Sequence, residues 1–544
     1  MSSRDRIDLV FLGARVETMV DGSARADAVA VRGGRIVEVG STADVRRLIS
    51  RRTRVIDLDG ETIVPGFQDA HIHPIDGGLL SWSCDLHDLG HASAYLDAVA
   101  AFANAHPDRE WVAGAGWSLP AFRGGEPDRR LLDAIVPDRP VFLYSEDGHV
   151  AWANSRALAA AGVNRATPDP ADGRIVRDAE GEPTGTLHDG AMGLVDRLLP
   201  KLTHSDLLAG LRVAQGQLHA LGITAWQDAS VEADALAVYR EAAEAGWLTA
   251  RVVAAHRWRR EGGLEQIDSF ERLREEAVVG RLRADSVKLV LDGILESRTA
   301  YMTSPYVDED GSLGTEAGAP FIDADLLLEA VVELDRRGFQ AHFHAIGDGA
   351  IRLALDAVEG AVEANGATDR RHHIAHVEVV HPADVARFGG LGVVANIQPF
   401  WASDDDQMQM LRIPLLGPDR VRWQYPFASL LRTGATLAGG SDWTVSTPNP
   451  LLEIEVAVTR IAPDTREVAP FIPEERLTLD EALRAFTIGS AYVNHLDATT
   501  GTIEVGKLAD LVVLNRDLRD PDAGPIGEAT VRQTFVEGQE VFSA

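Results

Sequence analysis

Two histidines spaced two residues apart are the first feature of this sequence that points to chemistry. They occur in Asp69-Ala-His71-Ile-His73-Pro74, directly after an apolar run with the pattern of a strand. Side chains at positions i and i+2 of a strand lie on the same face, so both imidazoles can reach one metal ion. A single pair of this kind is not decisive, so its meaning depends on the other polar residues of predicted strands.

Three later predicted strands also carry, at or near their ends, residues of the kinds that bind metal ions. His342 and His344 repeat the two-residue spacing in HFHAIGD, His376 lies in RRHHIAHVE, and Asp442 closes ATLAGGSDW. A lone histidine in a strand is more often a buried structural residue, and an aspartate at a strand end is more often a helix cap. Either His342 or His344 has the correct parity for a ligand, and His344 lies nearer the strand end.

Lys288 lies inside the predicted strand of DSVKLVLDG and shares its parity with Asp292. A lysine on the inside of a barrel strand is unfavourable unless it is paired or chemically altered. A simple ion pair would satisfy that requirement. Because the histidines, the lysine and Asp442 follow one another in strand order, the sequence favours a shared site over several unrelated structural roles.

The middle of the chain must supply the elements that position these residues. Strand and helix patterns alternate there, which predicts parallel βα units. Nine strand candidates compete for the eight places of a barrel: ETIVPGFQDAHIH, RPVFLYSED, GITAWQDA, LTARVVAAH, DSVKLVLDG, GFQAHFHAIGD, RRHHIAHVEVV, LGVVANIQP and GATLAGGSDW. We assign RPVFLYSED to an insertion at about residues 80–200, which is rich in Trp, Pro and Gly and too long for a plain βα loop.

Both ends of the chain have the pattern of short β-strands broken by turn residues. We therefore predict an α/β protein with a (β/α)₈ TIM barrel over residues 66–495. Residues 1–65 and 496–544 are expected to meet in one small β-sandwich.

Composition excludes several classes of partner. The 544 residues carry a net charge of −31, which argues against nucleic acid or an anionic membrane. No run approaches the roughly 18 apolar residues of a membrane span, and no signal peptide is recognised, so we expect a cytoplasmic protein. Cys84 is the one cysteine, which excludes an intramolecular disulfide. The expected partner is a small-molecule substrate, with a homodimer possible.

The motifs PGFQDAHIHP, SEDGHVAWANSRAL, HAIGDGA, AHVE, GGSDW and GTIEVGKLADLVVL resemble the amidohydrolase superfamily. Within it they are similar to the YtcJ-like branch, which includes N-substituted formamide deformylase. The resemblance covers nearly the whole chain. It implies a metal-dependent hydrolase whose barrel carries a β-sandwich made from both ends of the chain.

The resemblance also implies roles for individual residues. The metal ligands would be His71, His73, Lys288, His344, His376 and Asp442, with Lys288 at a position that is often carboxylated and bridges two metals. The catalytic residues would be Asp442, Lys288 and His376, with Asp442 acting as the proton shuttle for a metal-activated hydroxide. Such N and O ligands suit zinc, as one or two ions.

The insertion and strand ends supply the substrate-binding candidates, which are His149, Trp117, Trp152, Arg298 and Gln398. Tryptophans are usually packing residues, and Asn154 can simply cap the following helix.

The expected reaction is hydrolysis of a C–N bond in an amide, an N-substituted formamide or an N-acyl amine. Alternatives are hydrolysis of an ester, cyclic amide or carbamate, and a lyase or decarboxylase reaction on the same site. A metal-free interaction protein on this barrel is an alternative of a different class.

Overall fold

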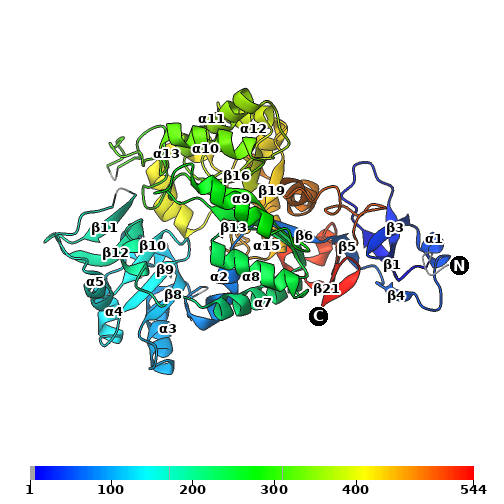
Figure 1. The fold of residues 1–544 in the computed structure, drawn as a ribbon, viewed down its shortest axis with the longest axis horizontal. Helices are drawn as coiled ribbons and strands as arrows, with labels where there is room; N and C mark the ends of the chain where they lie inside the picture. The colour runs from blue at the N-terminus through cyan, green and yellow to red at the C-terminus, as the bar shows by residue number, and fades with distance from the viewer. Residues whose placement is uncertain (1–5, 88, 171, 309) are drawn as a thin grey trace.

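A computed structural model describes residues 6–544 with the exception of residues 88, 171 and 309. Its strands form three separate sheets. Figure 1 shows a central barrel wrapped by helices, an inserted subdomain on one side and a terminal β-domain on the other. No helix within the described part of the chain is long and apolar enough to cross a membrane.

The central barrel is an eight-stranded parallel sheet in which strands that follow one another along the chain are neighbours. The seam between its first and last strands is bridged by main-chain bonds, from Asp442 N to His71 O at 2.7 Å and from His73 N to Trp443 O at 2.8 Å. Its strands are β6 (Phe67–Ile72), β13 (Ile223–Val231), β14 (Arg251–Arg257), β15 (Leu282–Val290), β16 (Gln340–Ala345), β17 (His373–His376), β18 (Val394–Ile397) and β19 (Leu437–Gly439). The predicted (β/α)₈ barrel is confirmed.

Helices surround the barrel because each has an apolar face. On α10, for example, Leu327, Val331 and Leu334 are buried at helical spacing. The barrel helices are α2 (Pro74–Leu79), α7 (His204–Ala220), α8 (Ala233–Glu244), α9 (Gln266–Glu276), α10 (Ala324–Arg336), α11 (Asp348–Asn365), α12 (Val385–Leu391), α13 (Ile413–Arg420), α14 (Phe427–Arg432), α15 (Pro450–Thr459), α16 (Leu479–Arg484) and α17 (Ser490–Val493). Along β15, Val287 and Leu289 belong to the core shared with these helices. Lys288, between them, points the other way, into the barrel, where it reaches His71.

The insertion between α2 and α7 forms a six-stranded sheet of its own, with one apolar core of its own and a second that it shares with residues of the barrel. Its strands are β7 (Cys84–Asp85), β8 (Val112–Trp117), β9 (Val141–Ser145), β10 (Val150–Ala153), β11 (Gly173–Arg177) and β12 (Pro183–Asp189), and its helices are α3 (Ala92–Ala105), α4 (Arg129–Ile135), α5 (Ser155–Ala161) and α6 (Gly193–Asp196). The segment RPVFLYSED contributes β9 to this sheet and no strand to the barrel, as the sequence predicts.

The terminal domain joins the two ends of the chain in one eight-stranded sheet, seen as blue and red strands together in Figure 1. Its strands are β1 (Leu9–Val16), β2 (Ala26–Arg32), β3 (Arg35–Gly40), β4 (Arg54–Asp57), β5 (Thr62–Pro65), β20 (Leu511–Leu514), β21 (Val531–Val536) and β22 (Gln539–Ser543), and α1 (Thr42–Arg46) packs beside them. The meeting point is the antiparallel pair β5–β20. Alternate residues of β1 belong to two different apolar clusters, with Phe11 in one and Val10 in the other, so both faces of the sheet are covered.

Candidate active site

A cavity of about 1560 Å³ lies where the barrel strands end beneath the insertion. All six predicted metal ligands line this cavity: His71, His73, Lys288, His344, His376 and Asp442. They come from β6 and the residue that follows it, from β15, β16 and β17, and from the segment after β19. This is the carboxyl-terminal mouth of the barrel, where enzymes of this architecture carry their active sites.

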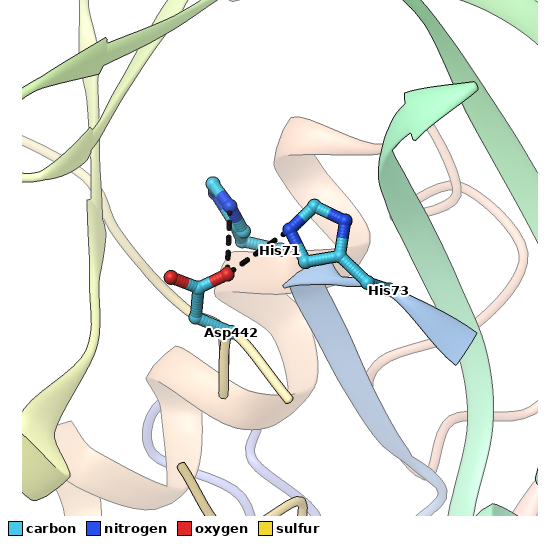
Figure 2. Close-up of side chains that lie close together, drawn as sticks. All are labelled: His71, His73 and Asp442. Carbon is cyan, nitrogen blue, oxygen red and sulfur yellow. Dashed lines mark ion pairs between the residues drawn. The ribbon is translucent and has the colours of Figure 1, made fainter. Parts of the chain in front are cut away.

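Three of these side chains form a tight cluster at the floor of the cavity, shown in Figure 2. Oδ1 of Asp442 lies 3.2 Å from Nε2 of His71 and 3.1 Å from Nε2 of His73. Two ligand atoms at this separation, each about 2.1 Å from a zinc ion, would subtend roughly 100° at the metal, close to the angle of tetrahedral sites. The cluster therefore has the spacing of a first coordination shell.

The other three predicted ligands surround this cluster. Nζ of Lys288 lies 3.2 Å from Nε2 of His71. Nδ1 of His376 lies 3.9 Å from Oδ2 of Asp442, and the rings of His376 and His344 are 4.4 Å apart between centroids. The structure thus brings all six side chains into one group.

The ring nitrogens of His376 lack hydrogen-bond partners among the described residues. The side chain of His376 is nevertheless buried. Buried polar atoms normally have partners, so a free ring nitrogen at this place fits the role of a metal ligand. The backbone conformation also indicates a functional site. The φ values of His376, Val377 and Asp442 are 77°, 49° and 54°. Such left-handed conformations are uncommon for non-glycine residues and cluster at functional sites.

Burial and mutual contacts set the charges of the site. Burial lowers the pKa of His71 to about 3 and that of Lys288 to about 7. Burial also holds the pKa values of His344 and His376 well below their ordinary range, so both are neutral imidazoles, the form that binds metal. For Asp442, burial would raise the pKa, but contacts with His71 and His73 outweigh it and keep the carboxylate ionised.

Asp69 supports the group from behind, a role that the sequence did not reveal. Its Oδ1 accepts hydrogen bonds from the backbone N–H groups of His71 and Ser441, at 3.0 and 3.1 Å. One buried carboxylate therefore ties the strand that carries the histidine pair to the segment that carries Asp442. The motif's leading aspartate, two residues before the first histidine, is the signal for it in the sequence.

Comparison with known proteins agrees with this geometry. The family model described as "Amidohydrolase family" matches residues 54–542. The chain belongs to the amidohydrolase family. The match extends from the terminal domain through the barrel and back, so it includes every element that builds the cavity.

Three curated relatives align with almost the entire amidohydrolase chain. Protein LONG AFTER FAR-RED 3 of Arabidopsis thaliana is 33% identical over 98% of this chain and 91% of its own length. Putative amidohydrolase YtcJ of Bacillus subtilis is 30% identical, over 98% of this chain and 99% of the relative. N-substituted formamide deformylase of Arthrobacter pascens is also 30% identical, over 98% of this chain and 97% of the relative. The predicted resemblance to the YtcJ-like branch is confirmed.

A solved structure supports the class of reaction. An uncharacterized metal-dependent hydrolase from Pyrococcus furiosus superposes with a TM-score of 0.71 at 26% identity, covering 94% of this chain and 99% of the other. Family, fold and the His71–His73–Asp442 cluster together make this chain a metal-dependent hydrolase of the amidohydrolase family.

His149 is the predicted substrate-binding residue that the structure places on the cavity of the amidohydrolase. Its Nδ1 lies 2.6 Å from Oδ1 of Asp189, and its ring centroid is 5.3 Å from that of His344. Burial lowers the pKa of His149, but the bond to Asp189 more than offsets it, so the net direction is upward. His149 therefore faces the candidate ligands from the insertion.

The other four substrate-binding candidates lie away from the residues that line the cavity. Trp117 and Trp152 are fully buried in the core of the insertion, where their rings meet edge to face and each indole N–H donates to a backbone carbonyl. Arg298 pairs with Asp308 and Glu316. Gln398 is fully buried behind β17. Packing or polar partners within the protein account for each of these four side chains, and their contact with substrate stays a prediction.

Asp189 and Trp401 are cavity residues that contact predicted site residues but were not themselves predicted from the sequence. Asp189 holds His149, and Trp401 stacks on the ring of His376 at 5.4 Å between centroids. Trp401 opens the segment WASDDDQMQM. The proximity of Asp189 to His149 depends on the pairing of β10 with β12, which the sequence does not specify.

Proposed function

We propose that this amidohydrolase cleaves the C–N bond of an amide, with N-substituted formamides and N-acyl amines as the leading substrate classes. The observation that carries the proposal is that Oδ1 of Asp442 lies within 3.2 Å of Nε2 of both His71 and His73 at the cavity. These residues would hold a divalent cation such as Zn²⁺, which would supply a Lewis acid and lower the pKa of a bound water towards ~7.

Asp442 is positioned to move the proton that hydrolysis requires. It is ionised, and its Oδ2 faces His376 while Oδ1 faces the histidine pair. A carboxylate at this place accepts the proton of the attacking water and returns it to the leaving nitrogen. Amine leaving groups need that proton more than alcohol leaving groups do, which favours an amide over an ester as the substrate.

His149 supplies a polar contact on the opposite wall of the cavity. Because Asp189 fixes its Nδ1 side, the imidazole can face the scissile group without losing side-chain entropy on binding. We assign it to holding the substrate carbonyl. This assignment is the part of the proposed site that depends on the insertion.

The choice of formamides rests on similarity. N-substituted formamide deformylase aligns over 98% of this chain. The test is to assay the zinc-supplied protein against matched N-substituted formamides, N-acyl amines, esters, cyclic amides and carbamates in ¹⁸O-labelled water. We expect fastest turnover of an open-chain amide, with solvent oxygen in the acid product. Products without solvent oxygen would indicate a lyase or decarboxylase, and fastest turnover of an ester or cyclic substrate would overturn the proposed bond.

A further inference from the structure

Hydrogen-bonded polar side chains lie inside the barrel beneath the candidate metal ligands. They come from β13, β16, β17 and β18 and from the residue after β18, and they are at most 4% exposed: Gln227, Gln340, His342, His373, Asn396 and Gln398. Apolar side chains usually fill such a barrel interior, so a polar core of this kind requires another explanation. The bonding pattern of these residues fixes the direction of each hydrogen bond.

The first amide is oriented by the backbone. One terminal atom of the Gln340 side chain lies 2.7 Å from Val493 O, 2.8 Å from Arg371 O and 3.3 Å from Arg370 O. Carbonyl oxygens only accept hydrogen bonds, so this atom must be the NH₂ group. The Oε1 atom of Gln340 therefore faces the barrel interior.

Gln227 is oriented in turn. Its side-chain nitrogen lies 3.2 Å from Oε1 of Gln340 and 2.9 Å from Oδ1 of Asn494. Two acceptors at one end require the amide nitrogen there, which leaves Oε1 of Gln227 at the other end. That oxygen lies 2.6 Å from Nδ1 of His342 and 3.0 Å from Nε2 of His373. Both imidazoles must donate to it.

The chain of bonds then reaches a metal ligand. His342 is fully buried and has no carboxylate partner among the described residues, so it is neutral. Because its Nδ1 carries the proton, its Nε2 accepts, and the group 2.9 Å away is Nδ1 of His71. His71 must therefore carry its proton on Nδ1. Its Nε2, which lies 3.2 Å from both Oδ1 of Asp442 and Nζ of Lys288, then carries the lone pair.

A second series of hydrogen bonds leads to the same oxygen, Oε1 of Gln227, through His373. It requires the same donor and acceptor assignments as the first. The backbone N–H of His376 donates to Oε1 of Gln398 at 2.8 Å, so the amide nitrogen of Gln398 donates to Oδ1 of Asn396 at 3.0 Å. The nitrogen of Asn396 then lies 3.1 Å from Nδ1 of His373. His373 accepts there and donates from Nε2 to Gln227, as the first series requires.

We propose that His342 and Gln227 are positioning residues that hold His71 in the tautomer whose Nε2 is free for the metal. The metal site itself is part of the proposed function, but this inference concerns how the protein prepares it. A histidine that bore its proton on Nε2 could not coordinate through that atom. The backbone carbonyls around Gln340 thus determine the state of a side chain on the far side of the barrel interior.

The test measures zinc affinity, by chelator competition with the purified full-length protein and without substrate. His342→Phe keeps a flat ring but removes the acceptor for His71, and we expect the Kd for zinc to rise 10- to 100-fold. His342→Gln restores an acceptor near the position of the imidazole Nε2 and should bind zinc within about threefold of wild type. A Kd unchanged in His342→Phe, or raised equally in both variants, would overturn the proposal.

Two further variants separate the proposed role from general damage to the barrel. His256 is also a buried barrel histidine, but it bonds only to Ala284 O within the described hydrogen bonds. His256→Phe should leave zinc affinity unchanged, and an equal loss there would contradict a specific role for His342. If His342→Phe does not fold, Gln227→Met replaces it, and wild-type affinity in that variant overturns the proposal. Because no turnover is measured, failure of the proposed reaction would leave these outcomes unaffected.

Discussion

The carboxylate of Asp442 lies between two histidines and remains ionised despite its burial. Asparagine has the same size but cannot accept a proton. We expect Asp442→Asn to lower kcat/KM by about 10²–10⁴-fold, the usual contribution of a positioned acid–base group. The melting temperature should change little, since the backbone bond from residue 442 to His71 remains. Activity within tenfold of wild type would contradict the role of proton shuttle.

His256, on β14, gives a pH dependence that can be measured without substrate. Burial lowers its pKa from 6.5 to about 4. Between these values the unfolded chain binds a proton and the folded chain does not, so stability is lost as pH falls from 6.5 to 4. The loss is on the order of 3 kcal/mol.

His256→Phe should remove this contribution. Denaturant unfolding of both proteins at a series of pH values measures it, and the wild type should lose stability relative to the variant as the solution is acidified. Parallel curves for the two proteins would mean that the histidine is protonated equally in the folded and unfolded states.

At the scale of elements, the position of the histidine pair depends on how closely α2 packs against α7. The helix α2 begins directly after His73. A Cβ atom added to Gly78 on α2 would lie 1.9 Å from the carbonyl oxygen of Gly210 on α7, so the helices approach closely only because both residues are glycines.

Gly78→Ala must therefore push the helices apart, and we expect it to lower the free energy of unfolding by about 1–3 kcal/mol. Gly216 is a matched control on α7, because a Cβ atom there meets nothing within 4 Å. Gly216→Ala should stabilise the protein by about 0.5–1 kcal/mol. Chemical denaturation measures both changes, and equal effects of the two substitutions would contradict the close packing.

At the scale of the whole molecule, Arg251 connects the barrel to the terminal domain. It opens β14 and is 5% exposed, and it pairs with Asp510 beside β20 and with Glu537 in the β21–β22 turn. Arg251→Met leaves the buried carboxylate of Asp510 without its partner. We expect this loss to lower the free energy of unfolding by about 3–5 kcal/mol.

The control for Arg251 is Arg240, which forms an ion pair with Glu276 on the surface. Arg240→Met should cost less than about 1 kcal/mol. Denaturant unfolding of both variants compares them. If Arg251→Met lowers the free energy of unfolding no more than Arg240→Met does, this contact does not hold the terminal domain to the barrel.

The sequence predicted the barrel and the six cavity-lining candidates because both depend on local pattern. The two-residue spacing of His71 and His73 places both side chains on one face, and strand order places His344, His376 and Asp442 at one mouth. The alternation of side-chain direction along a strand also predicted that Lys288 points into the barrel. The same reasoning could choose between His342 and His344 only by distance from the strand end, and the structure puts His344 on the cavity.

The interior hydrogen-bond network and the substrate contacts could not be predicted in the same way. Gln227 bonds to His342 because of how strands separated by more than a hundred residues are arranged across the barrel. Trp117 and Trp152 looked like pocket residues, but the packing of the inserted sheet buries them. Burial depends on which face a neighbouring element covers, and short motifs do not contain that information.

Metal content tests the central claim most directly. Purified wild-type protein, His71→Ala and Lys288→Ala are compared by mass spectrometry after supply of zinc and removal of free ions. The account predicts at least one divalent metal per wild-type chain and its loss in His71→Ala. About two metals, falling in Lys288→Ala, would indicate that Lys288 bridges two ions, whereas one metal insensitive to Lys288 would indicate a single-ion site. Wild-type protein that retains no divalent metal would contradict the account and favour a non-enzymatic role for this barrel.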